Sequence, residues 1–255
     1  MIWRCRDYAI DLSRVRVMAI LNVTPDSFSG DGLYGSPEEV LRRARRCVEE
    51  GADLIDIGGE STRPGATPLP WEEEWARVEP VAAAVAALGV PASIDTYHPE
   101  TAERALAAGV SVLNCVFPEP VPEMAEFARE SGAGLIIPSS ALDALPFREE
   151  LSRQTVIDPM IGFGTTREED IALLGSLRRL AMRAPVCAGV SRKRIVKRLA
   201  GKKVLGKNPG GTLAAALWCA MNGASVLRVH DVAETVQALR VTEALAEALP
   251  GGGEA

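Results

Sequence analysis

The chain has 255 residues, of which 47% are hydrophobic and 24% are charged, and its formal net charge is −6. Because lysines and arginines are scattered through an acidic sequence, a nucleic-acid-binding face is not indicated. No apolar run approaches the ~18 residues that would suggest a membrane-spanning helix. Charged residues interrupt the N-terminal segment, where a signal peptide would need an apolar core. We therefore expect a cytoplasmic protein without nucleic-acid or membrane partners.

The five cysteines lie far apart in the sequence and include no Cys-x-x-Cys pair. Since the chain contains only two histidines, a tetrahedral zinc site is not favoured. Reduced thiols, as in cytosolic proteins, are the natural interpretation. Cys187 and Cys219 are expected to pack in the core, because free cysteine behaves as a small apolar residue.

Short apolar runs alternate with longer amphipathic runs along the chain. The expected strands, in chain order, are residues 17–21, 54–57, 92–94, 110–113, 135–137, 155–157, 186–188 and 225–229. The clearest helical runs are residues 36–50, 71–88, 99–108, 168–180, 211–222 and 231–249. The first of these helices has a good start, because Ser36 can cap it, Pro37 takes the first helical position and two glutamates follow.

The repeated alternation of strand and helix predicts a parallel sheet. Eight such units in about 240 residues match an α/β fold of the (β/α)8 TIM barrel type, which typically has about 250 residues. A doubly wound open sheet is the alternative. It normally has a Gly-x-Gly-x-x-Gly turn after its first strand, and no such turn follows Leu21. The whole chain, residues 1–255, is thus expected to form one domain.

Three segments are expected to depart from the regular barrel pattern. Residues 1–14 should form a short hairpin that covers the bottom of the barrel. Only residues 138–154 separate the fifth and sixth strands, and they contain at most two helical turns, so the fifth βα unit should be abbreviated. The glycine-rich tail at residues 250–255 is expected to be disordered.

The most informative stretch is residues 22–32, which follow directly on the first expected strand. This stretch contains one amide, two carboxylates, three hydroxyls and one aromatic ring, whereas a simple connector needs only turn residues. Proteins of the α/β class place their chemistry in the loops that follow the strands. We therefore interpret the stretch as part of a ligand site, with a plain connector as the alternative.

Polar residues follow nearly every expected strand, and in a barrel the ends of parallel strands share one rim. Asp95, Asn114 and Asp158, with Lys193 as counter-charge, offer hydrogen-bonding groups that suit a flat heterocycle such as a pterin or guanine ring. A second, more basic set suits a phosphate or pyrophosphate, which arginine can contact through two bonds and a metal can bridge. This second set is Asn22, Arg63, Arg228 and His230.

Six segments of the chain resemble, in the same order, those of the dihydropteroate synthases, the pterin-binding barrel enzymes of folate synthesis. They are residues 22–29 (NVTPDSFS), 56–65 (DIGGESTRPG), 93–96 (SIDT), 158–164 (DPMIGFG), 191–194 (SRKR) and 228–231 (RVHD). The resemblance extends from residue 16 to about residue 245, nearly the whole chain. A single match would be weak, but six in order favour membership of this family over coincidence.

The resemblance implies a transferase that joins 6-hydroxymethyl-7,8-dihydropterin diphosphate to p-aminobenzoate and releases diphosphate. It also implies Mg²⁺ as cofactor and a homodimer as assembly. The C–O bond would break first, giving a pterin methylene cation that the arylamine attacks. Metal, arginine and histidine charges would stabilise the leaving diphosphate, and carboxylates would stabilise the cation. Loop closure would exclude water as a competing nucleophile.

The resemblance also assigns roles to individual residues. For catalysis it implies Asp26, Asp31, Arg63, Asp95 and Lys193. For the pterin ring it implies Asp95, Asn114, Asp158, Phe163 and Lys193. For the diphosphate it implies Asn22, Arg63, Arg228 and His230, with Asn22 also ligating Mg²⁺. For the p-aminobenzoate pocket it implies Phe28, Thr62, Arg63, Pro64, Phe163, Lys193 and Arg194.

The chain departs from the family pattern at several positions near these residues. Cys115 takes the place of an aspartate, and Gly30 precedes Asp31, the second carboxylate of the first loop. The Met-His-x-x-Gly segment after the fifth strand is absent. Met160 stands in place of glycine, and Thr165 in place of the usual lysine. These differences leave open a non-catalytic or altered pterin-binding protein. A methyltetrahydrofolate-dependent methyltransferase is less favoured, because the first two loops are complete.

Four of these residues also have a plain structural interpretation. Asp95 could cap the helix expected at residues 99–108, and Asp158 could form an ordinary turn with the proline after it. Lys193 could belong to a solvated basic run, and His230 could pair with the aspartate that follows it at a helix start. The cysteine beside Asn114 is expected to be passive, since no histidine lies nearby in the sequence to activate it.

Overall fold

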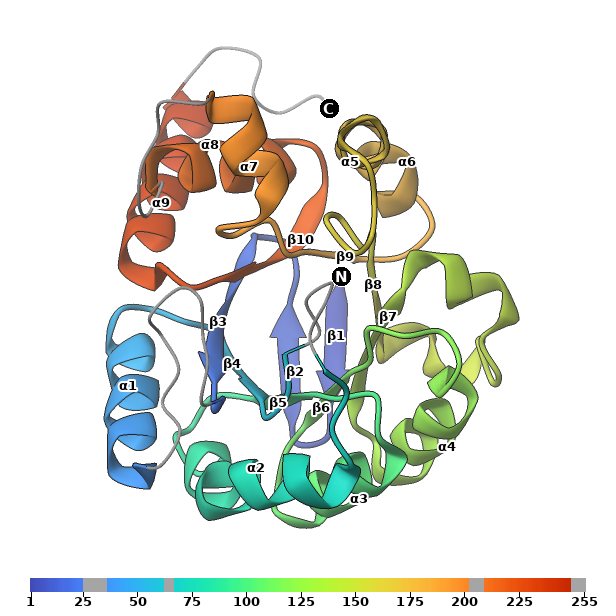
Figure 1. The fold of residues 1–255 in the computed structure, drawn as a ribbon. Coiled ribbons are helices and arrows are strands. Elements are labelled where there is room, and N and C mark those ends of the chain that lie inside the picture. Colours follow the sequence, from blue (N-terminus) through green and yellow to red (C-terminus); the bar gives the residue numbers. More distant parts are fainter. Residues whose placement is uncertain (25–35, 62–66, 202–208, 249–255) are drawn as a thin grey trace.

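The computed structural model describes residues 1–24, 36–61, 67–201 and 209–248. Within these ranges, eight parallel strands close into a barrel in the order β10-β3-β4-β5-β6-β7-β8-β9 (Figure 1). The barrel strands are β3 (Arg16–Asn22), β4 (Leu54–Gly58), β5 (Ala92–Asp95), β6 (Val112–Asn114), β7 (Gly134–Pro138), β8 (Thr155–Asp158), β9 (Val186–Ala188) and β10 (Ala224–Val229). Each overlaps a strand expected from the sequence, so the (β/α)8 TIM barrel is confirmed and the open sheet is excluded.

Helices follow the strands around the outside of the barrel. They are α1 (Pro37–Glu49), α2 (Trp71–Ala86), α3 (Pro99–Ala107), α4 (Val121–Ser131), α5 (Arg167–Gly175), α6 (Leu177–Ala181), α7 (Arg194–Ala200), α8 (Pro209–Met221) and α9 (Val232–Ala248). The expected helix at residues 168–180 is divided into α5 and α6 at Ser176. None of the helices in the described ranges is long and apolar enough to cross a membrane.

The sequence patterns did not single out α4 or α7. Pro120 and Pro122 obscured α4, because proline usually interrupts a helix. Here Pro120 precedes the helix and Pro122 lies in its first turn, where the missing N–H would have no intrahelical partner anyway. The short α7 follows a basic run and has only two buried residues, Ile195 and Val196, so its apolar pattern is weak.

The fifth βα unit is abbreviated, as expected. Two short 3-10 helices, η1 (Ser139–Ala144) and η2 (Glu150–Arg153), occupy the connection between β7 and β8 in place of an α-helix. Leu142, Leu145 and Leu151 from this connection are buried in the core around the barrel. The connection therefore still covers the outside of these strands.

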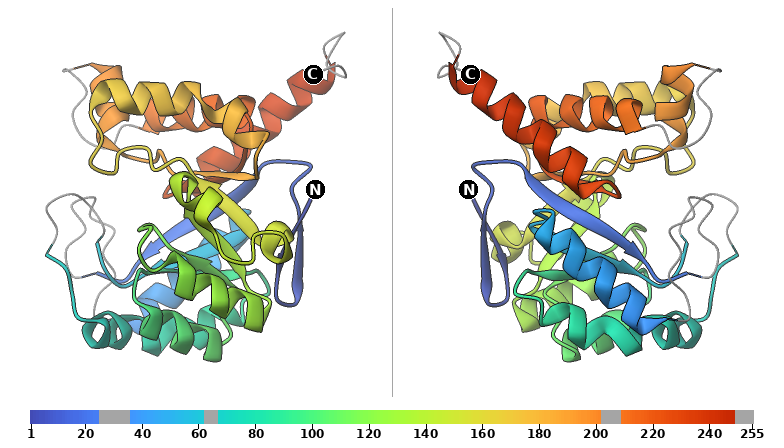
Figure 2. Two further views of the ribbon diagram at one scale, coloured as in Figure 1. Left: turned by 90° about the vertical axis from the view of Figure 1, so that its right-hand side faces the viewer. Right: turned by 90° about the vertical axis from the view of Figure 1, so that its left-hand side faces the viewer.

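The expected N-terminal hairpin is present, with β1 (Ile2–Cys5) pairing antiparallel to β2 (Tyr8–Asp11). Its Trp3 and Ile10 side chains are buried against the first inward-pointing residues of the barrel strands. The Trp3 indole Nε1 also donates a hydrogen bond to the Gln154 carbonyl oxygen at 2.6 Å. The hairpin therefore covers the end of the barrel at which the strands begin (Figure 2).

The inside of the barrel has an apolar layer at the bottom and a polar layer above it. The apolar layer contains Met18, Leu54, Val112, Ile136, Val156, Cys187 and Val226, all buried. Because alternate residues of a strand face the same side, the residue two positions later also points into the barrel. That residue is Asp56 on β4, Asn114 on β6, Asp158 on β8 and Arg228 on β10. Strand geometry thus places polar groups in the barrel mouth above an apolar floor.

Candidate active site

The mouth of the barrel is organised around Arg228. Its Nε donates to Asp56 Oδ2 at 2.5 Å, and its Nη2 donates to Asp95 Oδ2. The Nδ2 of Asn114 donates to the same Asp56 oxygen at 3.1 Å. These four side chains come from β10, β4, β5 and β6, so their contacts cross the mouth of the barrel and fix it as one network.

The position of Asp95 excludes its interpretation as a helix cap. The residue that precedes α3 is His98, and its side chain makes no capping hydrogen bond. The Asp95 carboxylate instead pairs with Arg228, which was expected in a separate outer set of basic residues. Asp95 and Arg228 therefore belong to one cluster in the mouth, and a contact of Arg228 with diphosphate stays a prediction.

Asp56 is a residue of the mouth that the sequence analysis did not place there. It is fully buried, and it is held by Arg228 and Asn114. The signal that could have found it is its place in the strand. Leu54 packs in the apolar floor, so the next residue on the same face of β4 has to be Asp56.

Two carboxylate oxygens of this network, Asp56 Oδ1 and Asp95 Oδ1, are buried and have no hydrogen-bond partner among the described residues. Leaving a buried acceptor unpaired costs about 1–3 kcal/mol, and a charged one costs more. Donors on a bound molecule would remove that cost. The two oxygens therefore suit a ligand that carries several N–H groups.

Burial dominates the electrostatics of the mouth. It raises the pKa of Asp95 to about 7, although the guanidinium of Arg228 acts to lower it. Burial also raises the pKa of Asp158, which Lys193 acts to lower, and burial lowers the pKa of Lys193, which Asp158 acts to raise. For Arg228, burial acts to lower the pKa, but Asp56 and Asp95 outweigh it and raise the pKa. The charged forms of these groups therefore depend on their partners.

Lys193 and Phe163 lie together, as expected for a second pocket. The Lys193 Nζ is 4.6 Å from the centre of the Phe163 ring and donates to the Ile161 carbonyl oxygen at 2.5 Å. The Lys193 stem also packs on Gly162, where an added Cβ would lie 2.9 Å from the lysine Cδ. Lys193 is therefore held in the mouth and is not part of a solvated basic run. The neighbouring residue Arg194 is exposed. Its expected contact with p-aminobenzoate stays a prediction.

His230 is buried directly after β10 and is positioned by Ser191. The imidazole Nδ1 lies 2.9 Å from Ser191 Oγ, and that oxygen also accepts the backbone N–H of His230 at 3.2 Å. Asp231, which was considered as a partner of His230, forms an ion pair with Arg192 at 2.5 Å. The loops that follow β9 and β10 are thus joined by the Ser191–His230 contacts and by the Arg192–Asp231 ion pair.

Asn22 ends β3 and is level with Gly58, the last residue of β4. A Cβ added to Gly58 would lie 3.7 Å from Asn22 Oδ1 and 3.8 Å from the Cβ of Asp95, so the two side chains flank this glycine. Because β3 also pairs with β10, Asn22 and His230 come from neighbouring strands of the same rim. The two described residues expected to bind diphosphate outside the carboxylate network therefore lie on the same side of the rim.

Six expected site residues fall outside the residues that the structure describes. They are Asp26, Phe28, Asp31, Thr62, Arg63 and Pro64. Their roles in catalysis, diphosphate binding and the p-aminobenzoate pocket stay predictions. The expectation for residues 250–255 also falls outside the described ranges.

Asp158 forms a turn and also faces the mouth. Its Oδ1 accepts the N–H of Met160 at 2.6 Å, which is the turn that the Asp-Pro sequence suggested. Met160 has a φ of 63°, in the left-handed region that favours glycine. A residue with a side chain pays about 1–2 kcal/mol for that conformation. This cost gives a physical reason for the glycine that is usual in the family here.

Cys115 faces away from the mouth. Because Asn114 points into the barrel, the next residue points outward, and Cys115 is buried in the core between strands and helices. Its Sγ donates to the Phe117 carbonyl oxygen at 3.2 Å, and burial raises its pKa to about 12. The thiol is thus a neutral packing group, as expected for a passive residue. All five cysteines are buried free thiols.

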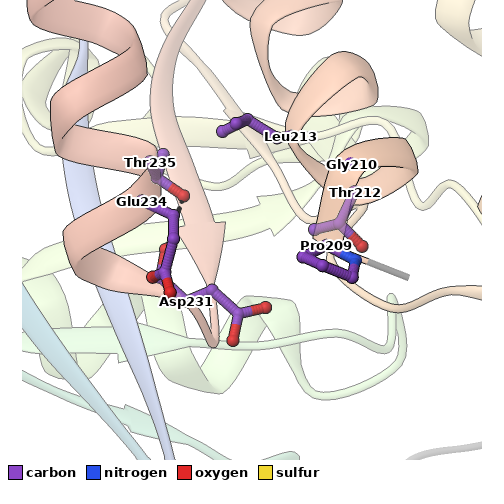
Figure 3. A pocket seen from close by; sticks show the side chains of 7 residues that line it. All are labelled: Pro209, Gly210, Thr212, Leu213, Asp231, Glu234 and Thr235. Carbon is purple, nitrogen blue, oxygen red and sulfur yellow. Dashed lines mark hydrogen bonds between the residues drawn. The ribbon is translucent and has the colours of Figure 1, made fainter. Parts of the chain in front are cut away.

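A separate pocket of about 100 Å³ lies between the N-terminal ends of α8 and α9 (Figure 3). Its lining residues are Pro209, Gly210, Thr212, Leu213, Asp231, Glu234 and Thr235. The lining includes carboxylates but no cationic side chain, so it does not suit a diphosphate. None of its residues is an expected substrate contact, and we assign it no part in the site.

A closed (β/α)8 barrel with buried ionisable groups at the carboxyl ends of its strands has the architecture of the barrel enzymes. The mouth of the barrel combines two buried carboxylate oxygens that lack a hydrogen-bond partner among the described residues with a lysine and an arginine. That combination points to an enzyme that binds a polar heterocycle. The sequence matches the family described as pterin binding enzyme over residues 18–155 and 150–230.

Known proteins narrow the family further. The dihydropteroate synthase of Neisseria meningitidis serogroup C is 35% identical over 279 residues, covering 96% of this chain and 97% of that protein. The Xanthomonas albilineans dihydropteroate synthase, solved with 4-aminobenzoic acid, has a TM-score of 0.87 at 39% identity, covering 97% of this chain and 99% of that one. Its structure with 7,8-dihydropteroate has a TM-score of 0.82 at 35% identity, covering 97% and 100%. The chain belongs to the dihydropteroate synthases, a family of transferases within the pterin binding enzymes.

Proposed function

We propose that this chain joins 6-hydroxymethyl-7,8-dihydropterin diphosphate to p-aminobenzoate, giving 7,8-dihydropteroate and diphosphate. The observation that carries the proposal is the buried network of Asp56, Asp95, Asn114 and Arg228, with its two open carboxylate oxygens. The family supports the reaction. The Xanthomonas structures with 4-aminobenzoic acid and with 7,8-dihydropteroate support the choice of the second substrate and of the product.

The pterin ring would lie in the mouth above the apolar floor. Asp95 and Asp158 would accept hydrogen bonds from its N–H groups, while Asn114 can both donate and accept. Lys193 would donate to a ring acceptor, since an ammonium offers three N–H bonds and only one is used by the Ile161 carbonyl. Ligand donors would satisfy the carboxylates in a buried site, where each hydrogen bond is stronger than in water.

The reaction begins with cleavage of the bond between the pterin methylene carbon and the diphosphate oxygen, and the bonding electrons leave with diphosphate. The carboxylates of Asp56, Asp95 and Asp158 would stabilise the positive charge that develops on the pterin. The nitrogen of p-aminobenzoate then attacks the methylene carbon and loses a proton as the C–N bond forms. Phe163 and Lys193 would hold the arylamine beside that carbon.

Arg228 has a double role in this proposal. Its Nε and Nη2 hold Asp56 and Asp95, so it orders the carboxylates that face the pterin. A guanidinium has five N–H donors, so further donors remain for an oxygen of the diphosphate. His230 and Asn22, from the same rim, would provide the other described contacts to the leaving group.

Mg²⁺ would be held by the side-chain oxygen of Asn22 together with oxygens of the diphosphate. The described residues contain no group of three or more His, Cys, Asp or Glu that could hold a metal by themselves. A single amide oxygen fits a hard cation that arrives with its phosphate ligands. When bound, Mg²⁺ would neutralise charge on the leaving diphosphate.

The proposal is tested by measuring diphosphate release from the dihydropterin diphosphate with Mg²⁺, with and without p-aminobenzoate. We expect release that depends on p-aminobenzoate and yields 7,8-dihydropteroate. Binding of the pterin without this release would instead establish the non-catalytic alternative.

We also propose that two copies of the chain associate through the side formed by α6 and α8. Met182, Trp218 and Met221 are 81%, 53% and 66% exposed there, although large apolar groups are usually covered. The ends of α6 and α8 lie against each other, since a Cβ added to Gly223 would lie 2.9 Å from the Cβ of Ala181. These exposed side chains therefore form one surface.

Trp218→Asp is expected to convert the dimer to a monomer, because it places a charge on this apolar surface. Sedimentation velocity at micromolar concentration measures the change. Ile2→Asp, on the N-terminal hairpin, is the matched control and should leave the dimer intact. A monomeric unmodified protein would contradict the proposal.

A further inference from the structure

The loop between β8 and α5 follows a tight path that includes one strained residue, Met160. Met160, Gly162 and Gly164 all have positive φ, between 63° and 79°. Within the loop, the Phe163 N–H donates to the Met160 carbonyl oxygen at 3.2 Å. Glycine adopts this conformation freely, but it also gives the backbone more freedom, and Met160 adopts it only at a cost. Side-chain contacts to the loop therefore help to decide where Phe163 lies.

Asp170, on the first turns of α5, supplies that support. It is only 1% exposed, and its Oδ1 accepts the N–H of Gly162 at 2.7 Å and the hydroxyl of Thr165 at 2.5 Å. The Thr165 oxygen also accepts the Gly162 N–H at 3.1 Å. A buried carboxylate that accepts two bonds from the same loop fixes the loop on both sides of Phe163.

The opposite side of the loop contacts Lys193. The Lys193 Nζ donates to the Ile161 carbonyl oxygen and lies over the Phe163 ring, and the lysine stem packs on Gly162. Asp170 therefore holds the segment whose other face orients Lys193. Neither role requires Asp170 to touch a substrate.

We infer that Asp170 is a positioning residue that sets the place of the Phe163 ring, against the Lys193 ammonium, for p-aminobenzoate. The inference rests on the proposed p-aminobenzoate pocket at these two residues. Loss of Asp170 should loosen the Phe163 side of the loop more than the pterin side, because Asp158 is fixed on strand β8 and Lys193 stands at the start of α7, outside the loop. The effect should therefore appear mainly in the KM for p-aminobenzoate.

Asp170→Ala tests the inference in steady-state kinetics with each substrate varied in turn. We expect about a tenfold rise in KM for p-aminobenzoate, against less than about a twofold change in KM for the pterin substrate. Asp170→Asn should recover most of the loss, because its amide oxygen can still accept from Gly162 and Thr165. Glu168→Ala, an exposed substitution on the same helix, should match the unmodified enzyme.

Two further variants keep the test decisive. If Asp170→Ala does not fold, Thr165→Val removes one of the two contacts without removing the carboxylate, and it should raise the same KM by a smaller factor. Phe163→Ala tests the pocket itself. An unchanged KM for p-aminobenzoate in Phe163→Ala would reject the pocket. If Phe163→Ala raises this KM but the Asp170 and Thr165 variants leave it unchanged, only the positioning role is rejected. Equal rises in both KM values would also overturn it.

Discussion

Asp95→Asn is expected to lower kcat by about 10²- to 10³-fold, the loss typical when one electrostatic contact to a developing charge is removed. The substitution keeps the shape of the side chain and an oxygen for Arg228, but it removes the negative charge that faces the pterin. Turnover measured as diphosphate release, at saturating concentrations of both substrates, gives the change. Burial raises the pKa of Asp95 to about 7 in the ligand-free protein, and kcat/KM reports the free enzyme. The loss in kcat/KM should therefore be larger at pH 8 than at pH 6, where the native carboxyl is itself partly protonated.

Asp53→Asn is the matched control for this substitution. Asp53 lies just before β4, at the opposite end of the strand from the mouth, and pairs with Arg16 at 2.9 Å. The activity of the Asp53→Asn protein should equal that of the unmodified enzyme. Undiminished turnover in Asp95→Asn would remove Asp95 from the catalytic site.

Arg228→Met is expected to destabilise the fold by about 3–5 kcal/mol, the cost of removing one partner of a buried ion pair. Methionine fills much of the space of the arginine stem but leaves Asp56 and Asp95 without their cation. The Asp95 carboxyl, whose pKa burial already raises, can escape by taking up a proton. A carboxyl whose folded-state pKa is raised binds more protons in the folded state, so stability falls as pH rises through that pKa. The free energy of unfolding, from urea denaturation, should therefore show a smaller loss at pH 5 than at pH 8.

Arg148→Met provides the comparison at the surface. Arg148 pairs with Asp143 at 3.1 Å, but both side chains are largely exposed, and such pairs contribute about 0–1 kcal/mol. A double variant tests whether the loss comes from the carboxylates that Arg228 leaves unpaired. Adding Asp56→Asn to Arg228→Met removes one of the stranded charges and should recover part of the loss. An Arg228→Met protein as stable as the Arg148→Met protein would contradict the buried network.

Much of the fold could be predicted from the sequence because the barrel repeats one pattern. Each strand is a short apolar run bounded by polar residues, and each expected strand overlaps an observed one. The short fifth unit was visible as a lack of residues between two strands. What failed was local: Pro122 concealed α4, since a proline in the first turn of a helix reads as a helix breaker unless the turn is known.

Site residues could be predicted where a sequence motif directly follows an expected strand. Residues whose role depends on contacts between distant segments were harder to predict. Asn114, Asp158 and Lys193 follow strands closely, and the structure brings them to one mouth. Asp56 could have been found from its alternation with Leu54. Asp170 could not, because its role depends on the path of the loop at residues 159–166, which includes a methionine at positive φ. No local pattern in the sequence records that path.

The hairpin that covers the barrel floor has a consequence for how the chain folds. It is synthesised before the barrel strands, yet its binding surface is assembled from side chains as far along the sequence as Val226. Until that last strand is in place, Trp3 and Ile10 have no complete site to pack in. Long-range contacts of this kind slow folding and leave early segments exposed to aggregation. The hairpin is thus synthesised before the surface that it covers, so a nascent chain that stalls before β10 presents an uncovered tryptophan to the cell's chaperones.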